Sequence, residues 1–358
     1  MDLGLIGQQR SSKTMVFDAV TRGHARAGSF GGLEPSIGVV KQPDERLDRL
    51  CALLEPKKMT QTEVRYLDFP GGLAVRDQAP DGAHLAALAQ CDALVHIARG
   101  FREDPAASVD WHRDIGDINL ELAFADAGML GRRAKRLDTG VRSGRPGERE
   151  AGERELALVQ RLREALDNEE PLRAQTLSAD EQRTISGYQL LTNRPLVIML
   201  NIEESDIGKI DEIEEEMRES CAGPGIEVGA LCGKLEQELA ELSDEEAAEF
   251  RADLGLETDG IARMLQLSQQ ALGLITFYTV TEPEGRAWAL TRGGTALDAA
   301  GKIHSDIARG FIRCETVGWQ ELLDCGSYAE ARKRGLLRTE GKQYTVQDGD
   351  VLHVLFNV

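Results

Sequence analysis

Residues 7–14 have the types and spacing of a phosphate-binding loop. They follow the pattern G-x-x-x-x-G-K-[ST], beginning at Gly7 and ending at Lys13 and Thr14. In such a loop backbone N–H groups and a helix N-terminus bind phosphate, the lysine reaches the β and γ phosphates, and the last hydroxyl binds Mg²⁺. Ser12 stands where the pattern has its second glycine, at the closest approach of backbone to phosphate. The octapeptide alone therefore fits a phosphate loop and a chance strand-to-helix turn equally well.

A second motif, D-x-x-G, favours the phosphate loop. It ends an apolar segment and runs from Asp68 to Gly71. In nucleotide-hydrolysing proteins an acidic residue at this strand end faces Mg²⁺, and the glycine N–H meets the γ-phosphate. Two elements in the expected order predict a site for a nucleoside triphosphate with Mg²⁺.

A third motif, N-x-x-E, falls where the base-reading N-K-x-D of GTPases is expected. Asn201 begins it, Ile202 replaces the lysine and Glu204 replaces the aspartate. The aspartate accepts hydrogen bonds from guanine, and the longer Glu204 needs a different geometry, whereas Asn201 can pair with the N6/N7 edge of adenine. The choice between ATP and GTP stays open.

The elements that must position these residues alternate between strands and helices. Residues 2–6 are an apolar run, followed by a polar loop and by helical spacing over residues 13–21. Further apolar runs are separated by segments long enough for crossover helices; they cover residues 64–67, 93–98, 196–200 and 226–231. This alternation predicts an α/β fold with a mostly parallel sheet. Helices are also expected over residues 44–54 and 83–89.

An inserted helical hairpin is predicted between residues 117 and 191. Its arms are expected at about 117–138 and 148–166, and the buried stripe of the first arm at Leu120, Ala123, Phe124, Ala127 and Leu130. Residues 131–149 hold seven basic and two acidic residues. This basic tip, which includes Arg132, Arg133, Lys135 and Arg136, is either a solvated surface or a contact for RNA phosphates or an acidic partner.

Composition limits the classes of partner. The 358 residues include 42 Lys and Arg against 61 Asp and Glu, a formal charge of −19, which opposes binding to DNA. The chain lacks a bilayer-spanning apolar run and a signal peptide, so we expect a cytoplasmic protein without membrane contact. The six cysteines form no C-x-x-C pair and are interpreted as ordinary, mostly buried thiols. From about residue 275 short strands surround one helix, expected at residues 296–308, which predicts a small α+β domain.

Together these motifs resemble the YchF subfamily of the Obg family of P-loop GTPases. The stretches 33–40, 119–123, 299–313 and 348–358 fall in the family's order, and the similarity covers nearly the whole chain. The resemblance implies a P-loop G domain at residues 1–116 and 192–272, the helical hairpin insertion at 117–191, and a C-terminal α+β, ubiquitin-like TGS domain at 273–358. It further implies binding of ATP or GTP with Mg²⁺ and association with ribosomes or translation factors through the basic tip and the TGS domain.

The family's site residues are carried over to matching positions of this chain. Thr14 and Asp68 are the implied Mg²⁺ ligands. The implied nucleotide-binding residues are Gly7, Arg10, Ser11, Ser12, Lys13, Thr14, Gly71, Asn201, Ile202, Glu204, Cys232 and Gly233.

The chain departs from the family at positions that matter for hydrolysis. Ser12 replaces a glycine, Gly31, Gly32 and Leu33 stand where a switch threonine is expected, and Gly72 follows the D-x-x-G motif. Because phosphoryl transfer depends on positioning and charge stabilisation, we expect weak or lost ATP or GTP hydrolysis and assign no catalytic residue. The alternative is a non-catalytic interaction module with a degenerate nucleotide site, acting through the hairpin and TGS domain. A dinucleotide-binding dehydrogenase is remote, because the glycines do not follow G-x-G-x-x-G.

Overall fold

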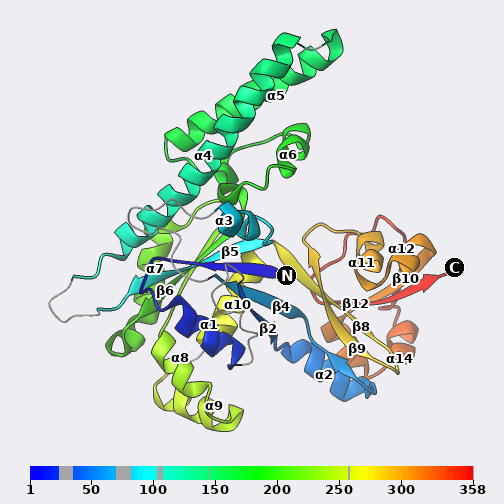
Figure 1. The fold of residues 1–358 in the computed structure, drawn as a ribbon. Coiled ribbons are helices and arrows are strands. Elements are labelled where there is room, and N and C mark those ends of the chain that lie inside the picture. The colour runs from blue at the N-terminus through cyan, green and yellow to red at the C-terminus, as the bar shows by residue number, and fades with distance from the viewer. Residues whose placement is uncertain (24–34, 70–81, 103–107, 144, 257–258, 358) are drawn as a thin grey trace. The chain divides into compact units, whose positions relative to one another are not determined.

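The computed structural model describes residues 1–23, 35–69, 82–102, 108–143, 145–256 and 259–357. The chain divides into two compact units (Figure 1). We call them the N-terminal unit, Met1–Val40 with Arg65–Ala271, and the C-terminal unit, Lys41–Val64 with Leu272–Val358.

The N-terminal unit is built on a six-stranded sheet in the order β2-β4-β1-β5-β6-β7. Strand β1 pairs in parallel with β4 and β5, β5 with β6, and β6 with β7. The expected α/β fold with a mostly parallel sheet is therefore confirmed. Every residue of β6 is buried, as expected for a strand covered on both faces. The strands are β1 (Asp2–Ile6), β2 (Ser36–Lys41), β4 (Glu63–Asp68), β5 (Ala93–Gly100), β6 (Leu196–Ile202) and β7 (Ile226–Leu231).

Helices of the N-terminal unit pack on this sheet and leave polar residues at the strand ends. Leu200 and Ile202 of β6 belong to a large apolar cluster that also includes residues of α3, α7 and α8. Because side chains alternate along a strand, Asn201 lies on the other face. The helices are α1 (Lys13–Thr21), α3 (Gly82–Leu88), α7 (Ile210–Cys221), α8 (Gly233–Leu239), α9 (Asp244–Asp253) and α10 (Gly260–Ala271), with the 3₁₀ helix η3 (Glu204–Lys209).

The inserted hairpin is present, with arms longer than expected. Helix α4 (Trp111–Ser143) and helix α5 (Pro146–Asp167) run side by side away from the sheet (Figure 1). The short helices η1 (Leu172–Ala174), α6 (Ala179–Ser186) and η2 (Leu191–Asn193) lead back to β6.

The predicted buried stripe of α4 was only partly correct. Leu130 is fully buried, as predicted, but Phe124 is 70% exposed and Leu120 is also exposed. Ile118 and Leu122, which were not in the predicted stripe, are fully buried. The buried stripe includes a charged residue, Asp126, at the same helical spacing. A search for apolar residues alone therefore selects a neighbouring face of the helix.

Asp126 is buried because it binds the chain that returns to β6. Its carboxylate accepts the N–H of Leu191 at 3.0 Å, the N–H of Thr192 at 2.8 Å and the Thr192 hydroxyl at 2.6 Å. These bonds replace the water that the carboxylate loses, which burial of a charged group requires. Asp126 thus fixes the base of the hairpin to the strand that carries Asn201.

The C-terminal unit contains a second six-stranded sheet, in the order β11-β10-β12-β8-β9-β3. Its strands are β3 (Met59–Thr60), β8 (Leu274–Val280), β9 (Gly285–Thr291), β10 (Phe311–Gly318), β11 (Arg338–Glu340) and β12 (Asp350–Phe356). Its helices are α2 (Glu45–Leu54), α11 (Ala296–Ile303), α12 (Ser305–Arg309), α13 (Trp319–Cys325) and α14 (Tyr328–Lys333).

The single helix expected over residues 296–308 is two helices. His304 between α11 and α12 has extended backbone angles (φ −167°, ψ 143°). Its ring Nδ1 accepts the N–H of Asp306 at 3.1 Å and so caps α12. His304 has this structural role because a ring nitrogen can replace the backbone acceptor that a helix start lacks.

Residues 41–64 divide differently from the expected boundaries, which assigned them to the nucleotide-binding domain. Leu47 and Leu50 of α2 are fully buried in a cluster with Tyr278 and Val317. Strand β3 pairs in parallel with β9, with Met59 opposite Gly285. This segment therefore supplies a helix and an edge strand to the C-terminal unit.

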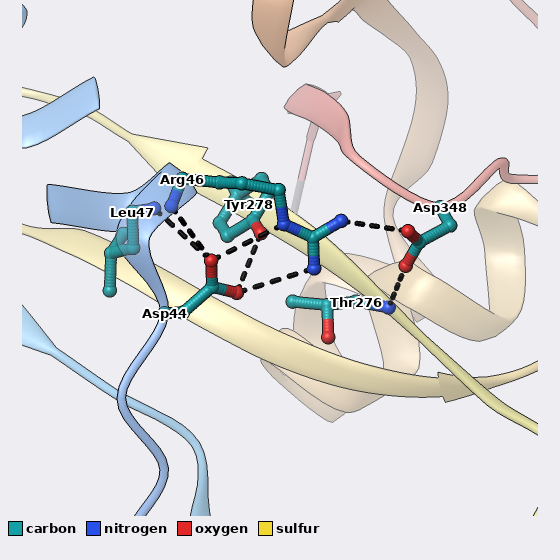
Figure 2. Close-up of polar contacts among 6 residues, drawn as sticks. All are labelled: Asp44, Arg46, Leu47, Thr276, Tyr278 and Asp348. Carbon is teal, nitrogen blue, oxygen red and sulfur yellow. Dashed lines mark hydrogen bonds and ion pairs between the residues drawn. The ribbon is translucent and has the colours of Figure 1, made fainter. Parts of the chain in front are cut away.

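The start of α2 is held by polar contacts (Figure 2). Asp44 is the N-cap, and its Oδ1 accepts the N–H of Arg46 at 3.0 Å. Its Oδ2 accepts the hydroxyl of Tyr278 at 2.7 Å. An acidic residue before a helix is a standard start signal, so the helix itself was predictable, but the partner on β8 was not.

No helix within the described residues is long and apolar enough to span a membrane.

Candidate nucleotide-binding site

The phosphate loop connects β1 to α1, as the motif predicts. A Cβ atom at Gly7 would lie 2.8 Å from the carbonyl oxygen of Ile97 and 2.7 Å from Ser11 Oγ, so only glycine fits there. Ser11 is buried, and its Oγ has no hydrogen-bond partner among the described residues. Arg10 (φ 66°) and Ser12 (φ 59°) have left-handed backbone angles.

The conformation of Ser12 explains why a glycine is expected at this position. A left-handed backbone costs about 1 kcal/mol or more for a residue with a Cβ atom, and almost nothing for glycine. The loop has the bend that the motif requires, with Ser12 directly before the first turn of α1. The serine therefore adds local strain where the backbone should approach a phosphate.

Lys13, Thr14 and Asp68 form one hydrogen-bonded group at the start of α1. Lys13 Nζ donates to Asp68 Oδ1 and, at 2.5 Å, to the carbonyl oxygen of Phe69. Thr14 Oγ1 donates to Asp68 Oδ2 at 2.9 Å. Lys13 and Asp68 are both buried, at 7% and 6% exposure. Strand β4 thus brings the D-x-x-G aspartate to the phosphate loop, as the parallel pairing of β1 and β4 requires.

The oxygens of this group fit a magnesium ion. Mg²⁺ prefers hydroxyl and carboxylate oxygens at about 2.1 Å in octahedral geometry, which places neighbouring ligands about 3 Å apart. Thr14 Oγ1 and Asp68 Oδ2 are 2.9 Å apart. These two oxygens are therefore a suitable pair of protein ligands for one Mg²⁺ ion, with the remaining positions available to phosphate and water.

Asn201 joins two loops at the other end of the site. Its Oδ1 accepts the N–H of Gly233 at 2.8 Å, and its Nδ2 donates to the carbonyl oxygen of Ser11 at 3.4 Å. Asn201 is 3% exposed. These bonds occupy one donor and one acceptor position of the amide. Asn201 therefore has fewer free hydrogen-bonding positions with which to pair with adenine. The sequence motif gave no signal of this bridging role.

Gly233 lies against Asn201 so closely that a side chain would disturb the bridge. A Cβ atom there would be 3.0 Å from Asn201 Oδ1 and 3.1 Å from a methyl carbon of Val16. Cys232 precedes it as the N-cap of α8 and is buried, which raises the pKa of its thiol. Ile202 is also buried, and its side chain packs in the apolar cluster.

Glu204 is paired with a lysine that sequence reasoning did not single out. Lys234 Nζ donates to Glu204 Oε2 at 3.1 Å, and both side chains are about half exposed. This hydrogen bond is the largest factor that raises the pKa of Lys234. Glu204 and Lys234 follow Asn201 and Gly233 respectively, so the pair lies beside the Asn201 bridge. The lysine therefore neutralises the carboxylate that was expected to read the base.

Several predicted residues lie outside the described residues. They are Gly71 of the D-x-x-G motif, Gly72 after it, and Gly31, Gly32 and Leu33 at the expected switch threonine.

The basic tip lies far along the hairpin from the phosphate loop (Figure 1). Arg132, Lys135 and Arg136 are exposed. Arg133 instead binds Glu155 of α5, with Nε 2.7 Å from Oε1, and lies over the ring of Tyr188. Only part of the predicted basic surface therefore offers free cationic groups.

Comparison with known proteins decides the family. A protein of Bacillus subtilis named "Ribosome-binding ATPase YchF" is 35% identical over 365 residues, covering 99% of each chain. A protein of the same name from Haemophilus influenzae is 34% identical with the same coverage. The chain belongs to the YchF family. The family model YchF-GTPase_C, described as "Protein of unknown function (DUF933)", matches residues 274–357.

The YchF fold extends over the whole chain. The solved structure of the Schizosaccharomyces pombe YchF GTPase superposes with a TM-score of 0.85 at 26% sequence identity, covering 99% of this chain and 97% of that one. The resemblance drawn from the three motifs and the C-terminal stretch is thus confirmed.

Proposed function

We propose that this YchF protein binds a purine nucleotide, ATP or GTP, together with Mg²⁺, and associates with ribosomes. The observation that carries the nucleotide part is the buried group of Lys13, Thr14 and Asp68 at the N-terminus of α1. Support for the ribosome comes from the relatives of Bacillus subtilis and Haemophilus influenzae, which are named ribosome-binding ATPases.

Each group at the site has a physical role in this proposal. The N-terminus of α1 and the loop N–H groups attract the phosphates, and Lys13 neutralises their charge. Thr14 and Asp68 hold Mg²⁺, which when bound offsets the charge of the β and γ phosphates. Asn201 keeps the phosphate loop and the Cys232–Gly233 turn at a fixed separation. Base and phosphate contacts are then positioned by the same residue.

We further propose that hydrolysis is weak or lost. Ser12 holds a left-handed conformation that suits glycine, and residues 31–33 provide no hydroxyl where the switch threonine is expected. Phosphoryl transfer is catalysed through positioning, so such changes reduce rate before they reduce binding. The alternative, an interaction module without nucleotide chemistry, rests on the same Ser12 strain.

Titration calorimetry with Mg²⁺ and non-hydrolysable ATP and GTP analogues tests binding. We expect binding of at least one analogue, abolished in Lys13→Ala and retained in Lys209→Ala, an exposed lysine of the same unit that is paired with Asp206. Absence of heat with both analogues, together with an unchanged melting temperature on their addition, would support the interaction module instead.

Turnover and ribosome association need separate measurements. Phosphate release should be much slower than for the Bacillus subtilis relative under the same conditions; an equal rate contradicts the loss of hydrolysis. Reversing the exposed charges Arg132, Lys135 and Arg136 to Glu should weaken co-sedimentation with ribosomes. Reversal of Lys209 and Arg218, which are exposed in the N-terminal unit and lie outside the hairpin, is the control. If Lys13→Ala co-sediments with ribosomes as the original chain does, and added nucleotide changes neither, the nucleotide site does not control ribosome contact.

A further inference from the structure

Helix α9 carries negative charge that the N-terminal unit does not neutralise. Residues 203–257 contain 19 acidic and four basic residues. Each of the four basic side chains already has a carboxylate partner: Lys209 with Asp206, Arg218 with Glu215, Lys234 with Glu204, and Arg251 with Glu236. By contrast, Glu245, Glu249 and Asp253 are exposed and form no ion pair or side-chain hydrogen bond among the described residues. Their charges are directed to solvent.

Two large apolar side chains interrupt these carboxylates. Phe250 is 47% exposed and Leu254 is 43% exposed. They are one helical turn apart and so share a face. Ala247 is the only buried residue among the described side chains of α9. The helix is thus attached through Ala247 and through the ion pair of Arg251 with Glu236, and its larger apolar groups remain exposed.

A cavity of about 390 Å³ adjoins this face, since Leu254 is also part of its wall. The wall combines apolar side chains, among them Ile207, Leu235 and Leu256, with the exposed carboxylate of Asp211. Two cations in the wall are compensated, because Arg263 and Arg218 both pair with Glu214. A volume of a few hundred Å³ is enough for a large side chain. Because the wall offers both apolar surface and the exposed carboxylate of Asp211, the cavity suits a long side chain with an apolar stem and a positively charged end.

We propose that Phe250, Leu254, the adjoining cavity and the carboxylates of Glu245, Glu249 and Asp253 form a docking surface for a basic amphipathic helix of a protein partner. The apolar face of that helix covers Phe250 and Leu254. One of its lysines or arginines enters the cavity, and the others face the carboxylates. The unneutralised negative charge disfavours RNA, whose phosphates it repels. This surface goes beyond the proposed nucleotide function, because it requires no nucleotide.

Fluorescence anisotropy with the full chain tests the proposal. The probe is a labelled peptide of leucine and lysine at amphipathic helical spacing. A peptide of the same composition in scrambled order and a labelled oligouridine are the comparison ligands. We expect the patterned peptide to bind, to bind more weakly as salt is raised, and to exceed both comparison ligands in affinity. Equal affinity for the scrambled peptide, or tighter binding of oligouridine, would overturn the proposal.

Two pairs of variants locate the binding. Phe250→Ser with Leu254→Ser, and separately Glu249→Lys with Asp253→Lys, should each weaken the peptide about tenfold. Matched controls lie on the hairpin: Phe124→Ser, whose residue is 70% exposed, and Glu150→Lys with Glu164→Lys. The controls should bind as the original chain does. If the serine variant does not fold, the charge-reversal pair decides alone, and unaltered peptide affinity in that pair refutes the docking surface. Nucleotide titration of each variant separates this result from the proposed nucleotide function.

Discussion

Nη1 of Arg46 donates to Oδ2 of Asp348 at 2.7 Å, although 302 positions separate the two residues in the chain (Figure 2). The other oxygen of Asp348 accepts the N–H of Thr276 at 2.8 Å, so one carboxylate joins α2 to β8. Residues 41–64 lie in the chain between residues 31–33, where the family's switch threonine is expected, and the D-x-x-G motif that begins at Asp68. The stretch that links these two segments is therefore part of the C-terminal unit.

The N-cap of α2 should contribute measurably to stability. Asp44→Ala removes the cap and leaves the hydroxyl of Tyr278 without its acceptor. We expect a loss of about 2 kcal/mol in the free energy of unfolding, measured by urea denaturation. Asp44→Asn, which keeps a capping oxygen, should lose less. Asp48→Ala, at an exposed position of the same helix, is the control, and a loss equal to that of Asp44→Ala would argue against a capping role.

The bridge made by Asn201 predicts that Asn201→Asp is harmful, whereas the same change at the exposed Asn193 is tolerated. Asn201→Asp keeps the acceptor for Gly233 but turns a carboxylate oxygen toward the carbonyl of Ser11. Because the residue is buried, we expect Asn201→Asp to destabilise the chain by about 2 kcal/mol or more, and to weaken nucleotide binding. Asn193→Asp, at an exposed position, should change neither. Normal stability and affinity of Asn201→Asp would mean that the bridge is dispensable.

The pairing of Glu204 with Lys234 predicts a change in base preference. In Lys234→Ala the carboxylate of Glu204 loses its partner and becomes available to accept hydrogen bonds from guanine. We expect the ratio of GTP-analogue to ATP-analogue affinity to rise in titration calorimetry. Lys209→Ala serves as control, since Lys209 pairs with Asp206. An unchanged ratio would show that Glu204 does not contact the base.

His96 on β5 predicts sensitivity to acid. Complete burial lowers the pKa of His96 to about 3, from an ordinary value of 6.5. At a pH between these two values His96 is protonated in the unfolded chain but neutral in the folded chain. The free energy of unfolding therefore falls as pH decreases below about 6.5. Between pH 7 and pH 5, protonation of this histidine in the unfolded chain should lower the free energy of unfolding by about 2 kcal/mol.

A variant that lacks only His96 isolates this effect. Urea denaturation of His96→Leu at both pH values should show a smaller loss than the original chain. His112→Leu, at an exposed position, should retain the full loss. Asp114, whose Oδ2 is 3.9 Å from His96 Nε2, remains in both variants, so the comparison reports on the histidine. An identical acid loss in His96→Leu would assign the sensitivity to other groups.

Much of the N-terminal unit could be predicted because local signals and burial agree there. The apolar run of β6 is continuous, and the loop between β1 and α1 has the residues its bend needs, apart from Ser12. The buried stripe of α4 was only partly predicted, because Asp126 is polar and its partners, Leu191 and Thr192, are distant in sequence. The break at His304 was missed for a related reason: apolar periodicity continues through it, whereas its backbone is extended and its ring nitrogen caps the start of α12.

The candidate site divides in the same way. Lys13, Thr14 and Asp68 were predictable because the motif spacing places them at neighbouring strand ends. The contacts of Asn201 with Ser11 and Gly233, and of Glu204 with Lys234, depend on side-chain directions that spacing does not determine. The assignment of residues 41–64 was missed because no composition change marks the point where the chain enters the other unit.

The course of residues 41–64 also limits how the protein can be divided or recombined. The chain passes between the two units three times, after Val40, after Val64 and after Ala271. Deleting everything after Ala271 would leave Leu47 and Leu50 without the core that buries them, and would remove β9 from the side of β3. A chimera that exchanges the C-terminal units of two relatives must therefore exchange two pieces of sequence, residues 41–64 and 272–358. Substitutions in α2 should accordingly be transferred together with those in β8 and β12.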